Sequence, residues 1–158
     1  MQSYDVTLSE LGSIPLAVVR RRAGGAELAR VVPECCGTVW NFLRAQGLRG
    51  GRNVAVYLDA AIHLEVGVEM EGAFQESAEV IRSGTPAGLV LTTTYFGQYT
   101  QLGPAHRAIT EWAKQHHQQL AGPSWEVYGH WQEEWNSDPS RIRTDIFYQV
   151  TPSATTAG

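Results

Sequence analysis

A single carboxylate lies among aromatic residues in the segment GPSWEVYGHW, which runs from Gly122 to Trp131. If this segment is a β-strand, the alternation of side chains places Glu126, Tyr128 and His130 on one face and Trp125 on the other. Glu126 is then a solvated strand residue, an anchor for a cation, or a general acid or base. Tyr128 could donate a hydrogen bond from the same face. We therefore take Glu126 and Tyr128 as candidates for ligand binding and, if the protein is an enzyme, for catalysis.

Further aromatic side chains are candidates to line a binding site. Trp40 and Trp112 fall on predicted helices, where packing of a helix on a sheet is the alternative role. Two more tryptophans flank an acidic loop, where unpacked aromatic rings would indicate a binding surface. In the last predicted strand, Phe147 and Tyr148 must point to opposite faces, and the sequence does not decide which of them is inward. The additional ligand-binding candidates are Tyr95, Trp131, Trp135, Trp40, Trp112 and Phe147.

Other residues with reactive or metal-binding side chains do not form a recognisable motif. Glu65 and Glu69 share one face of a predicted strand and are either a second acidic site or a solvated face. We interpret the adjacent Cys35 and Cys36 as small apolar helix residues rather than a redox pair, and they lack the spacing of zinc ligands. The histidines show no metal-ligand spacing, and no phosphate-binding glycine motif is present. We therefore expect neither a metal ion nor a cofactor.

The composition is that of an ordinary globular protein, with 43% hydrophobic and 18% charged residues in a chain of 158. The formal net charge of -4 and the scatter of the arginines do not fit a nucleic-acid-binding surface. No stretch approaches the roughly 18 apolar residues of a membrane span. The segment Met1 to Glu10 has no signal-peptide pattern. We expect a cytoplasmic protein that neither binds nucleic acid directly nor enters a membrane.

The two halves of the sequence resemble each other. Trp40 and Trp112 lie 72 positions apart, and the same offset relates Gly50 to Gly122. At this offset Glu126 corresponds to Val54, so the predicted acidic site exists in one half only. Further on, LEVGV aligns with IRTDI at an offset of 78. The common order and spacing of these identities indicate an internal duplication.

Each half has the same predicted order of elements. A β-rich run comes first, a helix with proline near its start follows, and two strands close the unit. In the first half these elements are Leu16 to Arg22, Pro33 to Gln46, Asn53 to Asp59 and His63 to Met70. In the second half they are Gly88 to Phe96, Pro104 to Leu120, Trp125 to Trp131 and Arg141 to Val150.

This order predicts an α+β protein with an antiparallel sheet and two long helices. The duplicated strand–helix–strand–strand units span about residues 5–72 and 86–150 of a single domain, residues 1–150. The connecting segment is predicted to be partly extended at Ser77 to Ile81. Residues 151–158 lack large apolar side chains and are predicted to be a disordered tail.

With these elements the chain resembles the GyrI-like domain, the effector-binding domain attached to many AraC-type and MerR-type multidrug regulators. The resemblance covers roughly Asp5 to Val150. Its distinctive parts are the Gly-x-Tyr turn at Gly97, the Glu-Val-Tyr strand at Glu126 and the segment Arg-Thr-Asp-Ile that begins at Arg143. The sequence departs from the family pattern at Gln149, where a proline is usual, and in an added loop with two tryptophans.

The resemblance implies a groove between the two halves that takes up flat, hydrophobic and often cationic small molecules. The glutamate of the family's Glu-Val-Tyr strand maps onto Glu126. Some stand-alone members are hydrolases that open the cyclopropane ring of DNA-alkylating natural products, and others are described as capturing a protein such as a topoisomerase. Three hypotheses follow: a binder of aromatic or cationic compounds for drug sequestration or self-resistance, a hydrolase that uses Glu126, and an inhibitor module with a protein partner.

Overall fold

The computed structural model describes residues 4–59 and 63–152. All of its strands belong to one antiparallel sheet, which confirms the predicted α+β class. The strands are β1 Thr7–Leu11, β2 Pro15–Arg22, β3 Asn53–Tyr57, β4 His63–Glu69, β5 Ile81–Gly84, β6 Gly88–Phe96, β7 Leu120–Tyr128 and β8 Arg143–Val150. The helices are α1 Leu28–Ala45 and α2 Gly103–Gln115. Most of the predicted tail, residues 153–158, lies outside the described residues.

The strand order β1-β6-β8-β7-β3-β4-β2-β5 contains two matching halves. Strands β6, β8 and β7 repeat the arrangement of β2, β4 and β3, and the halves meet where β3 pairs with β7. Each outer edge is formed by a short strand from the other half of the chain, because β1 pairs with β6 and β5 pairs with β2. The sequence did not predict β1, and the extended segment expected at Ser77 to Ile81 is β5, displaced toward the C-terminus.

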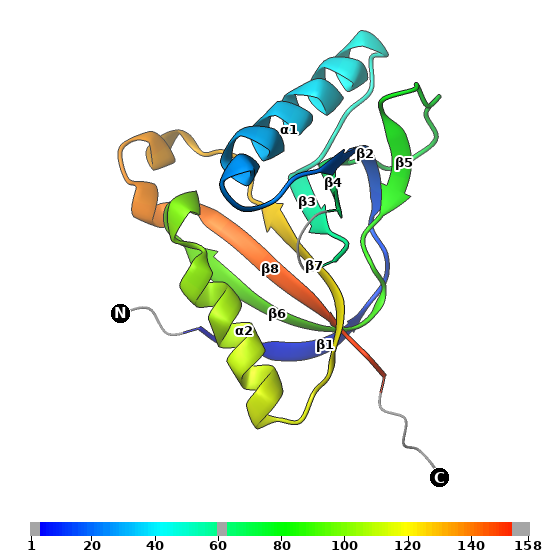
Figure 1. Cartoon of the computed structure of the whole chain (residues 1–158). Coiled ribbons are helices and arrows are strands. Elements are labelled where there is room, and N and C mark those ends of the chain that lie inside the picture. Colours follow the sequence, from blue (N-terminus) through cyan, green and yellow to red (C-terminus); the bar gives the residue numbers. More distant parts are fainter. Residues whose placement is uncertain (1–3, 60–62, 153–158) are drawn as a thin grey trace.

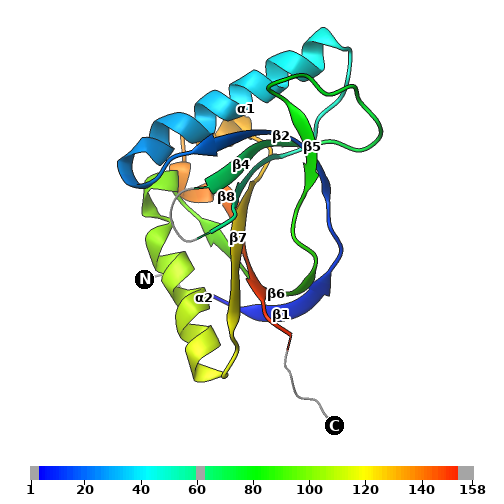
Figure 2. The same ribbon diagram turned by 45° about the vertical axis from the view of Figure 1, so that its right-hand side comes forward.

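Both helices cover the same face of this sheet. In Figures 1 and 2, α1 lies across β2 and β4, whereas α2 lies along β6 and β8. We call this face the helix face. The opposite face, which we call the open face, carries an apolar cluster of its own that includes Val54, Val56, Trp125 and Val127. No helix of the described residues is both long and apolar enough to cross a membrane.

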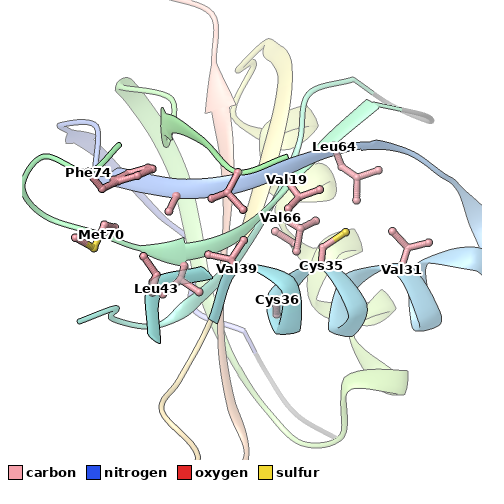
Figure 3. Packing of buried hydrophobic residues seen from close by; sticks show 14 of the residues in the cluster. Val19, Val31, Cys35, Cys36, Val39, Leu43, Leu64, Val66, Met70 and Phe74 are labelled. Carbon is pink, nitrogen blue, oxygen red and sulfur yellow. The ribbon is translucent and has the colours of Figure 1, made fainter. Parts of the chain in front are cut away.

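Helix α1 packs on the sheet through side chains that recur at helical spacing. Val31, Cys35, Val39 and Leu43 are buried and contact residues of β2 and β4, as Figure 3 shows. Burial of each large side chain of this kind contributes about 1.5–3 kcal/mol. The helix begins before Pro33, where the sequence predicted its start, because a proline in the second turn removes only one backbone hydrogen bond. The buried thiols agree with the apolar role predicted for the cysteines.

Helix α2 ends earlier than predicted. His117 has a left-handed backbone with φ 56°, and the amide of Gln118 donates to the carbonyl of Ala113 at 2.8 Å. This terminates the helix after Gln115, so Leu120 is already the first residue of β7. The prediction failed because it took Gly122 as the end signal, whereas a histidine here adopts the conformation that glycine usually supplies.

The 72-residue offset does not describe the central strands. Strand β3 ends in Val56-Tyr57 and β7 ends in Val127-Tyr128. The two strands therefore match at an offset of 71 positions, one fewer than predicted. Ala55 lies directly opposite Glu126, whereas Val54 points to the open face. The predicted correspondence of Val54 and Glu126 is therefore wrong, because residues one position apart in a strand face opposite sides of the sheet.

The two helical tryptophans are not equivalent either. At the end of α1 the amide of Leu48 donates to the carbonyl of Leu43, which matches the bond from Gln118 to Ala113 at the end of α2. Trp40 lies three positions before the accepting residue of α1, Leu43. Trp112 lies only one position before the accepting residue of α2, Ala113. The two tryptophans consequently lie on different sides of their helices.

Candidate functional site

Glu126 is the centre of a hydrogen-bonded group on the helix face. Its side chain is almost fully buried, with 6% of the residue exposed. The hydroxyl of Tyr128 donates to Oε1 at 2.5 Å, and the hydroxyl of Tyr57 lies 3.4 Å from the same atom. Nε2 of His106 lies 2.6 Å from Oε2. Because an ionised carboxylate only accepts hydrogen bonds, this arrangement fits a carboxylate anion surrounded by donors.

His106 connects this group to a third tyrosine. Its Nδ1 lies 2.7 Å from the hydroxyl of Tyr148, and the two rings meet edge to face. In a neutral His106, Nε2–H donates to Glu126 and Nδ1 accepts from Tyr148. We call Glu126, Tyr57, Tyr128, His106 and Tyr148 the glutamate network. Its members come from β3, α2, β7 and β8 and therefore link the two halves of the molecule.

The tyrosines of the network are held in their neutral form. Burial, followed by the negative charge of Glu126, raises the pKa of Tyr128 well above its ordinary value. The same two causes raise the pKa of Tyr148 to about 12 and also raise that of Tyr57. The three hydroxyls thus remain available as hydrogen-bond donors at neutral pH.

A cavity of about 680 Å³, which we call the apolar cavity, lies between α1, the ends of β3 and β7, and the segment before α2. Trp40, Tyr57, Tyr99 and Tyr128 supply its aromatic lining. The indole N–H of Trp40 donates to Asn53 Oδ1 at 2.6 Å, which fixes the orientation of that ring. Tyr99 meets Tyr128 edge to face, with ring centroids 5.5 Å apart. Such a cavity suits an aromatic molecule.

A second cavity, of about 530 Å³, lies against β3, β7, β8 and α2 and has a more polar lining. We call it the polar cavity. Polar side chains from six residues reach it: Tyr57, Asp59, His63, His106, Ser124 and Tyr148. Leu28 and Tyr57 line both cavities, so the two cavities share a wall. Glu126 itself lies behind the tyrosines and His106 that line them.

The structure brings some of the predicted site residues together and separates others. Glu126, Tyr128 and Trp40 lie in or behind the apolar cavity. Phe147 does not, because it stacks on Trp125 on the open face with ring centroids 5.3 Å apart. The pairing of Ile146 with Glu126 fixes this orientation, so Tyr148, rather than Phe147, is the residue that faces the network.

Two further candidates pack around α2. Tyr95 is 3% exposed within the apolar cluster beneath α2, and its hydroxyl donates to the carbonyl of Gln98. Trp112 packs against the edge of the same cluster and stacks on His116, with centroids 3.7 Å apart. Neither residue lines the two cavities described above. Both side chains therefore have a packing role that the sequence could not separate from ligand contact.

The added loop also lies apart from the cavities. Trp131 is 53% exposed, whereas Trp135 is buried and meets it edge to face. The indole N–H of Trp131 donates to Asn136 in the same loop. His130 does not share the strand face of Glu126, because β7 ends at Tyr128. The loop tryptophans thus stabilise one another rather than line either cavity.

Sequence reasoning missed Tyr57, His106 and Tyr148. A signal for Tyr57 existed in the repeated Val-Tyr at the ends of the central strands, but the 72-residue offset concealed it. His106 was considered only as a metal ligand, and nothing in its neighbourhood in the sequence indicates a partner 20 residues away. The face of Tyr148 depends on the register of β8 against β7.

The acidic pair Glu65 and Glu69 lies on the other side of the sheet. Glu65 is 4% exposed and accepts hydrogen bonds from Arg20, at 2.7 Å, and from Ser83. Arg52 forms a bidentate ion pair with Glu69. Burial opposes the ionisation of Glu69, but the hydrogen bonds from Arg52 outweigh it and lower the pKa of this carboxyl group. Both carboxylates are therefore neutralised by arginines, unlike Glu126, whose partners are tyrosines and a histidine.

Comparison with solved structures identifies proteins that share this architecture. The C-terminal domain of EcmrR superposes with a TM-score of 0.77 at 18% identity, covering 96% of this chain and all of that one. In the EcmrR–DNA complex the TM-score is 0.79, and the chain spans 58% of the EcmrR chain.

Two more distant structures have the same fold. SAV2435, solved bound to tetraphenylphosphonium, has a TM-score of 0.59 at 11% identity, with 93% of this chain and 94% of that chain covered. A hydrolase from Listeria innocua has a TM-score of 0.62 at 7% identity, with 92% of this chain and 91% of that chain covered. No family model and no curated protein sequence matches the chain. At these identities the likeness shows the fold alone, which is consistent with a GyrI-like domain.

Proposed function

We propose that this protein binds aromatic, hydrophobic cations in the apolar cavity and thereby sequesters toxic aromatic compounds. The observation that carries the proposal is the buried carboxylate of Glu126 behind an aromatic lining. The rings of Trp40, Tyr99 and Tyr128 offer faces and edges to an aromatic ligand, each worth about 0.5–2 kcal/mol with a cation. The tetraphenylphosphonium-bound structure of SAV2435, which shares the fold, supports this class of ligand.

The negative charge of Glu126 reaches the cavity without direct exposure. Tyr57 and Tyr128 stand between the carboxylate and the apolar cavity, and both donate toward the same oxygen. Their neutral hydroxyls do not cancel the charge, and a cation in the cavity is attracted through a medium of low dielectric constant. A neutral ligand of the same shape gains the apolar contacts but not this attraction.

A matched pair of probes tests the proposal by isothermal titration calorimetry. Methyltriphenylphosphonium and triphenylphosphine oxide present the same three rings, but only the first carries a net charge. We expect the cation to bind at least about tenfold more tightly, which corresponds to about 1.4 kcal/mol. Trp40→Ala should weaken both probes, whereas Trp131→Ala, which removes an exposed tryptophan outside the cavity, should change neither. Absence of binding by the cation would reject the proposed function.

A second function, hydrolysis, is favoured by the hydrogen-bonded chain from Tyr148 through His106 to Glu126. In a cyclopropane fused to a conjugated dienone, water would form a C–O bond to a ring carbon as the strained C–C bond breaks. The electron pair of that bond would pass to the carbonyl oxygen to give a phenolate, which Tyr128 could stabilise. The proton from water would pass along the chain, with Tyr148 taking it and giving its own proton to His106 Nδ1 while Nε2–H protonates Glu126.

Mass spectrometry distinguishes this activity from binding. The protein would be incubated with a cyclopropane-bearing alkylator, and a hydrolase should add one water to the mass of the compound. Glu126→Gln should abolish this product while the compound still quenches tryptophan fluorescence. Full turnover by Glu126→Gln would eliminate Glu126 as the base, and quenching without any change in mass would leave sequestration as the function.

A further inference from the structure

The two cavities that share Tyr57 and Leu28 differ in chemistry. The apolar cavity is bounded mainly by aromatic and aliphatic side chains from α1 and the segment before α2. The polar cavity, on the other side of the shared wall, receives imidazole, carboxylate and hydroxyl groups. A compact hydrophobic cation would occupy the first cavity and leave the second without a ligand group. The pair of cavities therefore suits a molecule that has two chemically distinct parts.

The polar groups of the second cavity can hold a substituent with several hydrogen-bonding atoms. Ser124 both donates and accepts, and it lies beside Tyr57 where β7 pairs with β3. His106 and Tyr148 form the far side, tied to each other at 2.7 Å. Asp59 and His63 complete the lining from the β3 and β4 side. Hydroxyl and amine groups of a ligand would find both donors and acceptors here.

The charges around the polar cavity favour an amine over an acid. Asp59 is a carboxylate, and Glu126 lies directly behind His106. One partner of Asp59 is His63, with Nδ1 2.7 Å from Oδ2, and both side chains are about half exposed. Even a fully charged contact exposed to this degree contributes at most about 1 kcal/mol, so a ligand ammonium group at Asp59 can compete with His63. Among the described residues, no lysine or arginine lines this cavity.

From this division we propose that the polar cavity is a second compartment of the binding site, and that the preferred ligand is a polycyclic aromatic compound bearing an amino sugar or a similar substituent with hydroxyl and amine groups. The aromatic part occupies the apolar cavity. The substituent extends past Tyr57 and Leu28, the two residues that line both cavities, into the polar cavity. This inference rests on the proposed function, because it assumes that the apolar cavity binds aromatic rings.

Daunorubicin and its aglycone, daunorubicinone, provide the test, since they share one ring system and only daunorubicin carries the amino sugar. Quenching of the drugs' own fluorescence would give both dissociation constants. We expect daunorubicin to bind at least about tenfold more tightly than the aglycone. The double variant Asp59→Asn with Ser124→Ala should reduce this ratio to below about threefold without changing the affinity for the aglycone. Asn at position 59 keeps an oxygen that can accept from the backbone N–H of His63.

The controls separate this inference from the proposed function. Trp40→Ala should weaken daunorubicin and the aglycone alike, because Trp40 lines the apolar cavity and not the polar cavity. Equal affinity for the two drugs, or a ratio that the double variant does not reduce, would overturn the two-compartment inference. So would binding of methyltriphenylphosphonium without binding of either drug, a result that leaves the proposed function intact. If methyltriphenylphosphonium did not bind either, both the proposed function and the two-compartment inference would be rejected.

Discussion

Replacing Glu126 with glutamine is expected to weaken the binding of methyltriphenylphosphonium by about 10- to 100-fold, or about 1.4–2.8 kcal/mol. The substitution removes the negative charge but keeps the size of the side chain. Triphenylphosphine oxide, which has the same rings and no net charge, should change by less than about threefold, because its contacts with Trp40 and Tyr99 are unaffected. Calorimetric titration of both probes against both proteins measures the difference.

The fold should tolerate this substitution. The amide oxygen of glutamine can accept from Tyr128, and its NH₂ group can donate to His106 once the imidazole proton moves to Nδ1. Glu65→Gln is the matched control, since Glu65 is equally buried in the same sheet but lies on the open face and pairs with Arg20. It should leave the affinity for both probes unchanged. A similar loss for the cation and the neutral probe in Glu126→Gln would show that Glu126 acts through packing and not through its charge.

Replacing Gly67 with alanine is expected to lower the free energy of unfolding by about 3 kcal/mol. Gly67 lies in β4 between Val18 of β2 and Val54 of β3. A Cβ atom at this position would lie 1.9 Å from the carbonyl oxygen of Ala17 and 2.8 Å from Cα of Val18, both of which are backbone atoms that cannot turn away. Relief of the clash requires β2 and β4 to separate, which breaks pairing in the sheet. Urea denaturation followed by circular dichroism measures the loss.

Gly37→Ala is the control for this prediction because it makes the same chemical change on an exposed position of α1. No atom lies within 4 Å of a Cβ built at Gly37. Alanine is favoured over glycine in a helix by about 0.5–1 kcal/mol, so this variant should be more stable than the original protein. We therefore expect the free energy of unfolding to fall in Gly67→Ala and to rise in Gly37→Ala. An equal stability of Gly67→Ala and the unmodified protein would mean that β2 and β4 are less closely packed than the structure shows.

The strands and helices were predictable where a local pattern settles the structure. Strand β6 was predicted with its observed bounds, Gly88–Phe96, because a run of β-branched and aromatic residues ends at the turn around Gly97. The start of α1 was missed because Pro33 indicates a helix start in most sequences. Strand β1 was missed because a short strand at a sheet edge has no strong pattern of its own, and its pairing with β6 involves residues about 80 positions away.

The candidate site was likewise predictable only where a pattern within one element settles it. Alternation along a strand places Glu126 and Tyr128 on one face, and both belong to the glutamate network. The other three members are supplied by β3, α2 and β8, which come close only when the sheet forms. Phe147 and Tyr148 illustrate the limit, because a register shift of one residue would exchange their faces.

The sequence by itself determined the α+β class, the antiparallel sheet with two helices and the face shared by Glu126 and Tyr128, since these follow from the spacing of residues within single elements. Tertiary structure alone decided that α2 brings His106 to Glu126, that Tyr148 faces the network instead of Phe147, and that Tyr57 separates two cavities of different polarity. The physical reason is that these contacts depend on strand register and on helix packing, which are set by the burial of many residues together and leave no periodic pattern around any one of them.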